Sequence, residues 1–232
     1  MPAFKWSELQ RETVDGPHSP AVAPVYRGQR LAVARVVYAA ATAVAPHARA
    51  HEQVHSILKG AARYRVGVEE RLVGPGDAVL IRSGTEYALR VLEDLEVVVF
   101  SEVSGTGPRA EVATRPPTFY RWSEMASDLI TPGYSSGRGP TITGERLEVA
   151  FMVYPAGTRA KPHAHPNEQI QVPLAGRVRT VVAGEARLVG AGDGILFPPN
   201  VEHAVEILED YTTINCKDIV PGFSVYHGRW ER

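Results

Sequence analysis

Short runs of apolar residues recur along the chain and predict strands rather than helices. In the second half these runs cover residues 147–154, 169–174, 178–183, 194–197, 204–208 and 211–216. Each is about six residues long, rich in β-branched side chains and bounded by Gly, Pro or Asn, as is typical of an antiparallel barrel or sandwich. No sustained helical period competes with them, and only residues 123–130 predict a helical turn or two. The chain is therefore predicted to be all-β.

The pattern occurs twice. Shifting the 232-residue chain by half its length, 116 positions, aligns residues 4–8 (FKWSE) with residues 120–124 (YRWSE). The register holds without a gap over most of the first half, which indicates two domains of one architecture. We place these domains at residues 1–105 and 116–232, joined by a segment where Gly, Pro and Thr replace the apolar runs.

Composition and charge narrow the class of protein. Hydrophobic residues make up 44% of the chain, and 25 basic against 26 acidic residues leave a net charge of −1. Such a chain folds but offers no electrostatic footprint for nucleic acid or an anionic membrane, so we expect a small-molecule partner. The single cysteine, Cys216, excludes an intrachain disulfide and a Cys-rich zinc module. Since no apolar signal or membrane-spanning segment is visible, we expect a cytoplasmic protein.

Histidines in the second half are spaced as metal ligands. His163, His165 and Gln169 share one parity, so in extended backbone they project from the same face. A neighbouring strand supplies His203, which follows a turn at Pro198-Pro199-Asn200. A lone histidine is usually a surface or core residue. A His-x-His pair accompanied by two further ligand-type residues, here Gln169 and His203, instead indicates a metal site. Three imidazoles and one carboxamide oxygen can hold one divalent transition metal ion and leave room for water or substrate.

At these residues the chain resembles the cupin superfamily. The first motif of that family runs Gly, five residues, His-x-His, three or four residues, Glu, six residues, Gly. Its positions are occupied here by Gly157, His163, His165, Gln169 and Gly176, with Gln where Glu is usual. The second motif resembles residues 192–203, with Asn200 in place of Gly and Ile207 in place of the terminal Asn. The resemblance covers both halves and implies a bicupin, two tandem jelly-roll (double-stranded β-helix) barrels.

The first half resembles the same pattern with parts replaced. On the repeat offset His47 and Gln53 are kept, while Arg49 replaces the second histidine and Tyr87 replaces the distal one. Two ligands seldom hold a metal, so a vacant barrel kept as half of a pseudo-symmetric pair is favoured.

A second metal in the first half stays open as an alternative. His51 and His55 share strand parity with His47 and Gln53 and offer further ligands at the same face.

A glutamine in place of the usual glutamate changes the charge of the predicted metal site and therefore the reactions that it favours. Because Gln169 is uncharged, the protein ligands leave the ion its full positive charge, which favours proton transfer, hydration or enolate chemistry. Dioxygen activation at iron commonly uses anionic ligands, so the substitution disfavours an oxygenase. Sequence leaves the ion open among zinc, iron, nickel and manganese.

The His-x-His-Pro-x-Glu-Gln variant resembles that of cupin metalloenzymes that act without redox change. These include the enzyme that linearises unsaturated uronates, certain polyketide cyclases and a bicupin isomerase of antibiotic synthesis. The similarity implies isomerase, cyclase or lyase activity on an oxygen-rich carbonyl compound. An Fe(II)-dependent dioxygenase and a small-molecule binding cupin with a structural metal are the alternatives. Substrate, and whether the chain is a monomer or a homodimer, stay open.

Candidate catalytic residues follow from strand parity. The uronate enzyme has an Asp twelve residues beyond its last histidine, but Asn215 stands at that place here, so its role as a base is not carried over. Asn215 and Lys217 should share the inward face of the last strand, where Lys217 can pair with a substrate carboxylate or, if desolvated, act as a base. Gln171 and Arg179 are further candidates for the barrel interior by parity.

Overall fold

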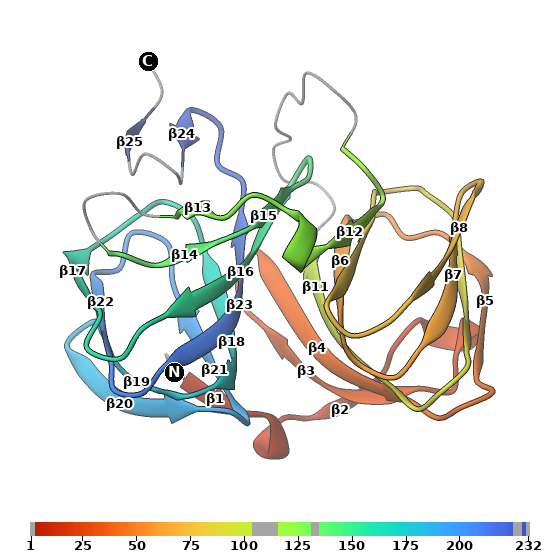
Figure 1. Ribbon diagram of the computed structural model, residues 1–232, viewed down its shortest axis with the longest axis horizontal. Coiled ribbons are helices and arrows are strands. Elements are labelled where there is room, and N and C mark those ends of the chain that lie inside the picture. The colour runs from red at the N-terminus through yellow and green to blue at the C-terminus, as the bar shows by residue number, and fades with distance from the viewer. Residues whose placement is uncertain (1–2, 104–115, 131–134, 225–228, 231–232) are drawn as a thin grey trace. The chain divides into compact units, whose positions relative to one another are not determined.

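A computed structural model describes residues 3–103, 116–130, 135–224 and 229–230 (Figure 1). Regular structure in these residues is antiparallel strand apart from 3-10 turns at Trp6–Glu8, Gly16–His18 and Trp122–Glu124. The predicted all-β class is thus confirmed. The helical turns predicted over residues 123–130 were wrong beyond Glu124, because the chain continues into a short strand, β13, at Asp128–Leu129.

The N-terminal barrel is built from two sheets. One has the strand order β12-β9-β6-β11-β4-β3-β2, and the other has the order β5-β10-β7-β8. Their bounds are β2 (Arg11–Thr13), β3 (Val22–Arg27), β4 (Leu31–Tyr38), β5 (Ala43–His47), β6 (Gln53–Lys59), β7 (Ala62–Val66), β8 (Glu69–Val73), β9 (Asp77–Ile81), β10 (Tyr87–Val91), β11 (Leu95–Glu102) and β12 (Phe119–Arg121).

The C-terminal barrel repeats this arrangement. Its larger sheet runs β1-β21-β18-β23-β16-β14-β13 with β15 also on β16, and its smaller sheet runs β17-β22-β19-β20. The bounds are β1 (Ala3–Lys5), β14 (Arg138–Gly139), β15 (Thr141–Thr143), β16 (Leu147–Tyr154), β17 (Arg159–His163), β18 (Gln169–Ala175), β19 (Arg177–Val182), β20 (Glu185–Gly190), β21 (Asp193–Phe197), β22 (His203–Ile207) and β23 (Tyr211–Asp218). Farther along the chain, β24 (Phe223–Ser224) pairs with β25 (Arg229–Trp230).

The first strand of each repeat pairs in the barrel of the other repeat. In β1, Phe4 lies opposite Gly194 of β21, and in β12 the aligned Tyr120 lies opposite Ala78 of β9. The described residues up to Glu8 accordingly group with those from Ala126 onward. The boundaries 1–105 and 116–232 remain a prediction about the sequence repeat, and most of the predicted joining segment lies outside the described residues.

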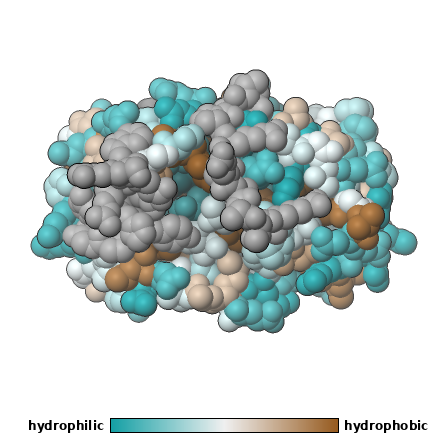
Figure 2. Space-filling view, turned by 90° about the horizontal axis from the view of Figure 1, so that it is seen from above, coloured by the Kyte–Doolittle hydropathy of each residue, from teal (hydrophilic) through white to brown (hydrophobic). Residues whose placement is uncertain are grey.

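Each barrel encloses an apolar core. Tyr64 and Leu95 are fully buried in the N-terminal barrel, as are Ile195 and Met152 in the C-terminal barrel. Among the residues that Figure 2 colours by hydropathy, hydrophilic ones predominate on the face shown, with smaller hydrophobic patches between them. Among the described residues, no helix has the length and hydropathy that a membrane crossing requires.

Two turn residues set the strand connections that carry the motifs. Asn200 has φ of 59°, a left-handed conformation that Asn tolerates better than most residues, at the turn that the sequence predicts. Gly176 has φ of +77°, and a Cβ there would meet the carbonyl oxygen of Asp210 at 2.1 Å. Only glycine therefore fits at this connection between β18 and β19.

Candidate metal centre

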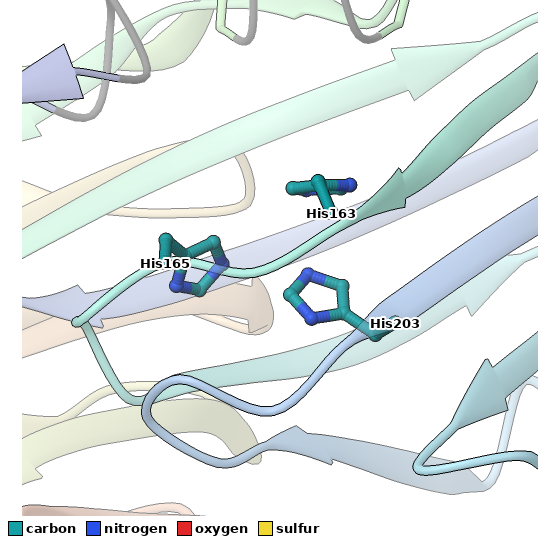
Figure 3. A group of neighbouring side chains, drawn as sticks. All are labelled: His163, His165 and His203. Atoms are coloured by element: carbon teal, nitrogen blue, oxygen red, sulfur yellow. The ribbon is translucent and has the colours of Figure 1, made fainter.

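Three imidazoles face one another inside the C-terminal barrel (Figure 3). His163 is the last residue of β17 and lies directly opposite His203, the first residue of β22. His165 follows on the loop that leads to β18. Strand pairing therefore brings together residues that are far apart in the sequence.

The distances are compatible with one shared ion. The ring centroid of His203 lies 4.4 Å from that of His163 and 4.8 Å from that of His165. One ligand nitrogen from each of the three lies within 4.8 Å of the others. At bond lengths of about 2.1 Å two nitrogens on one ion lie at most about 4.2 Å apart, so the three side chains would have to move somewhat closer together to share an ion.

Backbone carbonyls set the orientation of every ring. The Nδ1 atoms donate to carbonyl oxygens of Lys161, Asn167 and Val201, at 2.7, 3.0 and 2.9 Å from His163, His165 and His203 respectively. A neutral imidazole that donates through Nδ1 carries its lone pair on Nε2. Backbone hydrogen bonds of this kind are the usual support of a metal-ligating histidine.

Gln169 completes the donor set as the sequence motif predicts. Its Oε1 lies 3.2 Å from Nε2 of His165, whose proton is already on Nδ1. In this amide orientation both atoms offer lone pairs to a cation, whereas the amide turned by 180° would donate its N–H to Nε2. The four side chains thus offer the nitrogen and oxygen donor atoms that a divalent metal ion requires.

Electrostatics keeps the imidazoles neutral and able to bind a cation. Burial, helped by the charge of Lys217, lowers the pKa of His165 to about 2 and that of His203 to about 4. Burial likewise lowers the pKa of His163. At neutral pH protons do not compete for the Nε2 lone pairs.

A pocket adjoins the imidazoles. It is lined by His163 and His203 and also by Gln171, Asn215 and Lys217, the three residues that parity predicted as catalytic candidates. All three are at least nine-tenths buried. The structure thus places the predicted set along one cavity, while their roles in a reaction stay predictions.

Arg179, by contrast, does not face the barrel interior. Its side chain is 52% exposed and lies 3.9 Å from Glu206 on the outer surface. The prediction was wrong because Val178, Thr180 and Val182 are the buried residues of β19, so that strand has the opposite parity to the one assumed.

Glu148 is a residue of this site that sequence reasoning missed. It is buried on β16 directly opposite Lys217 of β23. Burial raises the pKa of Glu148 to about 7 and lowers that of Lys217 to about 8, and each charge opposes the effect of burial on the other. A single acidic residue within the apolar run of β16 was the signal in the sequence.

The corresponding position of the N-terminal barrel, which was expected to hold no metal, is filled by side chains of the chain itself. Arg49 and Tyr87, which replace two of the histidines, bind the buried carboxylate of Asp15. His47 lies against the same carboxylate, its Nε2 3.4 Å from Oδ1. His55 is committed elsewhere, with Nδ1 3.1 Å from the Tyr64 hydroxyl and Nε2 3.4 Å from Oε1 of Gln53.

His51 does not rebuild a metal site either. It borders a separate pocket of the N-terminal barrel. Within the described part of the chain, His163, His165 and His203 form the one group of histidine, cysteine or acidic side chains close enough to hold an ion. The alternative of a second metal at His47, His51, Gln53 and His55 therefore gains no geometric support.

Comparison with known proteins agrees with this architecture. The Cupin domain family matches residues 150–213, and the AraC-binding-like domain family matches residues 8–118. The chain belongs to the cupin superfamily and carries two cupin domains in tandem. No curated protein sequence matches the chain at a significant level.

Several solved structures share the two-barrel fold. AerE from Microcystis aeruginosa has a TM-score of 0.75 at 14% identity, with 95% of this chain and 100% of AerE covered. Protein Ylba from E. coli has a TM-score of 0.73 at 13% identity over 94% of this chain and 90% of its own. Oxalate decarboxylase from Bacillus subtilis has a TM-score of 0.70 at 16% identity over 99% and 78%. At these identities the likeness shows the fold alone.

Proposed function

We propose that the protein is a metal-dependent enzyme that acts on a small, oxygen-rich carbonyl compound by isomerase, cyclase or lyase chemistry without net redox change. The proposed ion is one divalent transition metal held by His163, His165, Gln169 and His203. The observation that carries the proposal is the convergence of imidazole lone pairs and an amide oxygen beside a pocket lined by Lys217.

An uncharged ligand set suits this chemistry. When bound, the ion would polarise a carbonyl oxygen and acidify the adjacent C–H or O–H group. None of the four side chains neutralises the ion's charge, in contrast to a set with a carboxylate. The same feature disfavours the dioxygenase alternative, since oxidation of the metal is aided by anionic ligands.

The other pocket residues supply polar groups for the substrate. Lys217 is buried at the pocket wall, where its charge can hold a substrate carboxylate. A pKa lowered by burial to about 8 also lets this lysine accept a proton near neutral pH. Oδ1 of Asn215 is buried and makes no hydrogen bond within the described residues, so it can accept one from a substrate hydroxyl. Gln171 lies beside it on the same pocket.

One structural neighbour is consistent with chemistry of this kind. Oxalate decarboxylase of Bacillus subtilis contains Mn(II) centres and by its name acts on a small dicarboxylic acid. Two tandem barrels of this fold can therefore house metal-dependent chemistry on a small acid.

The experiment has two steps. Elemental analysis of the purified protein is expected to give one transition metal ion per chain. Pyruvate in D2O under argon then serves as an enolisable probe, with deuterium at its methyl group followed by NMR. We expect exchange that is faster with the metal-loaded protein than with protein treated with a chelator.

Each other outcome overturns the proposal. Conversion that consumes oxygen and stops under argon would favour the dioxygenase. Retained metal with no exchange of pyruvate and no conversion of oxalate, at any pH from 6 to 9, would favour the binding domain. A protein that takes up no metal would remove both enzymatic readings.

A further inference from the structure

The carboxylate of Asp15 is bound at the centre of the N-terminal barrel as a ligand would be. Its Oδ1 accepts hydrogen bonds from the Tyr87 hydroxyl at 2.5 Å and from Nη2 of Arg49 at 3.0 Å. Its Oδ2 accepts one from the Tyr38 hydroxyl at 3.0 Å. Asp15 is only 2% exposed, so these side chains replace the water that a carboxylate normally binds.

The side chains that bind Asp15, here called the cradle, are Tyr38, Arg49 and Tyr87. They offer hydrogen-bond donors, whereas the candidate metal centre offers lone pairs. On the repeat offset, Arg49 stands where His165 stands and Tyr87 stands where His203 stands. In the C-terminal barrel these positions present lone pairs, whereas in the N-terminal barrel they present N–H and O–H donors. A site built from donors selects an anion, and its planar guanidinium favours a carboxylate.

The charged form of Asp15 is the one that the barrel stabilises. Burial alone would raise the pKa of Asp15, but the hydrogen bond from Tyr87 and the positive charges of His55 and Arg49 lower it below its ordinary value. The cradle therefore favours a charged carboxylate over a neutral group of the same shape.

Asp15 reaches the cradle from a loop. It lies between β2 and β3, with φ of 64° and ψ of 13°, and Gly16 follows with φ of 54°. A left-handed backbone is uncommon for a residue with a side chain and persists only where other contacts hold it. The pairing of β2 with β3 does not depend on Asp15, so the loop can leave the cradle without dismantling the sheet, although the stack of His18 on His47 at 4.4 Å must then open.

A pocket borders the cradle. Its polar lining includes Arg49, His51, Gln53 and Ser101 and also Arg27 and the carboxylates of Glu12 and Glu102, and its volume is about 140 Å³. Arg49 thus contributes both to this pocket and to the binding of Asp15. Its buried Nε has no hydrogen-bond partner among the described residues, so the guanidinium keeps a donor for another acceptor.

We propose that the N-terminal barrel holds a carboxylate-binding site which the chain fills with its own Asp15, and that small free carboxylates compete for this site. The tethered carboxylate acts at a high effective concentration, on the millimolar scale or above, so a free competitor binds weakly until the loop leaves. The site is distinct from the metal centre, and the inference does not depend on the proposed enzymatic function.

Acetate is the probe, and Asp15→Ala empties the cradle. We expect sodium acetate, but not sodium chloride at equal ionic strength, to raise the melting temperature of Asp15→Ala to a plateau. The neutral analogue acetamide should have no such effect, because it lacks the charge that Arg49 and Tyr87 bind. The wild-type protein should need at least tenfold more acetate for half of the effect, owing to its tethered competitor.

Two double variants separate this site from other sources of acetate binding. Asp15→Ala with Arg49→Ala should lose the saturable response. Asp15→Ala with His203→Ala should keep it, which excludes acetate bound to metal in the C-terminal barrel. If Asp15→Ala does not fold, Asp15→Asn keeps the side-chain volume without the charge and should respond to less acetate than the wild type. An equal response in wild type and Asp15 variants, or none in any of them, would overturn the proposal.

Discussion

The two barrels share one strand arrangement, but the side chains at their centres present opposite hydrogen-bonding groups. In the C-terminal barrel three imidazoles direct lone pairs at a common point, with the Gln169 oxygen beside them. In the N-terminal barrel Arg49 and Tyr87 direct donors at a carboxylate that the chain itself provides. Two aligned positions that hold histidines in one barrel and Arg49 and Tyr87 in the other thus account for much of this difference, on sheets of closely similar strand order.

The largest effect should come from removing a ligand of the cation. His203→Ala is expected to weaken metal binding by more than about a hundredfold, since even changes to the groups that support a ligand cost about 10–100-fold. Tyr87→Phe is the matched control, because it changes the aligned position of the other barrel and should leave the metal content unaltered. Metal per chain after dialysis, measured by mass spectrometry, checks both variants. Equal loss in the two would break the comparison.

The anion centre should matter to stability. Asp15→Ala leaves the charge of Arg49 without its partner and should lower the free energy of unfolding of the N-terminal barrel by about 2 kcal/mol, less than for a fully buried pair because Arg49 is partly exposed. Urea unfolding followed by fluorescence and circular dichroism measures this. Metal retention by the same variant should match the wild type, and a loss of metal would show that the two centres are coupled.

Charge can also be added to the cation centre. Gln169→Glu should keep the metal, or bind it more tightly, yet slow the exchange of pyruvate by about tenfold, because the carboxylate neutralises part of the charge that acidifies the substrate. Gln53→Glu is the matched change in the N-terminal barrel and should leave the exchange rate as it is. Faster exchange in Gln169→Glu would refute the role given to the uncharged ligand.

The smallest expected effect is the loss of stability when the pH is lowered. Because the folded-state pKa of Asp15 lies below its ordinary value of 3.8, its stabilisation is present above that value and is lost as the pH falls through the folded-state pKa. Between pH 5 and pH 3 the wild type should thus lose about 1 kcal/mol more stability than Asp15→Asn, which has no such carboxylate. Urea midpoints across this range give the answer, and parallel curves for the two proteins would argue against a charged Asp15.

Much of the cation site could be predicted because it follows from strand parity and a local motif. Parity on β18 and β23 sufficed to place Gln171, Asn215 and Lys217 on the pocket. The same reasoning failed for Arg179, since an alternating strand has two faces and only its neighbours decide which is inward.

The Asp15 site of the N-terminal barrel could not be predicted from strand parity or from a local motif. Asp15 is 34 positions from Arg49 and 72 from Tyr87, and it belongs to a loop, so no periodicity relates the three. The sequence also did not predict that β1 and β12 each pair in the barrel of the other repeat. The repeat at residues 4–8 and 120–124 identifies equivalent strands, but it does not say in which barrel each strand pairs.

The most direct test of the contrast between the barrels is a crystal structure of the metal-loaded protein, with anomalous scattering recorded at the absorption edge of the bound metal. We predict one anomalous peak per chain, between the Nε2 atoms of His163, His165 and His203 and the oxygen of Gln169, with the Asp15 carboxylate still bound by Arg49. A peak in the N-terminal barrel, or none among the three histidines, would contradict the account.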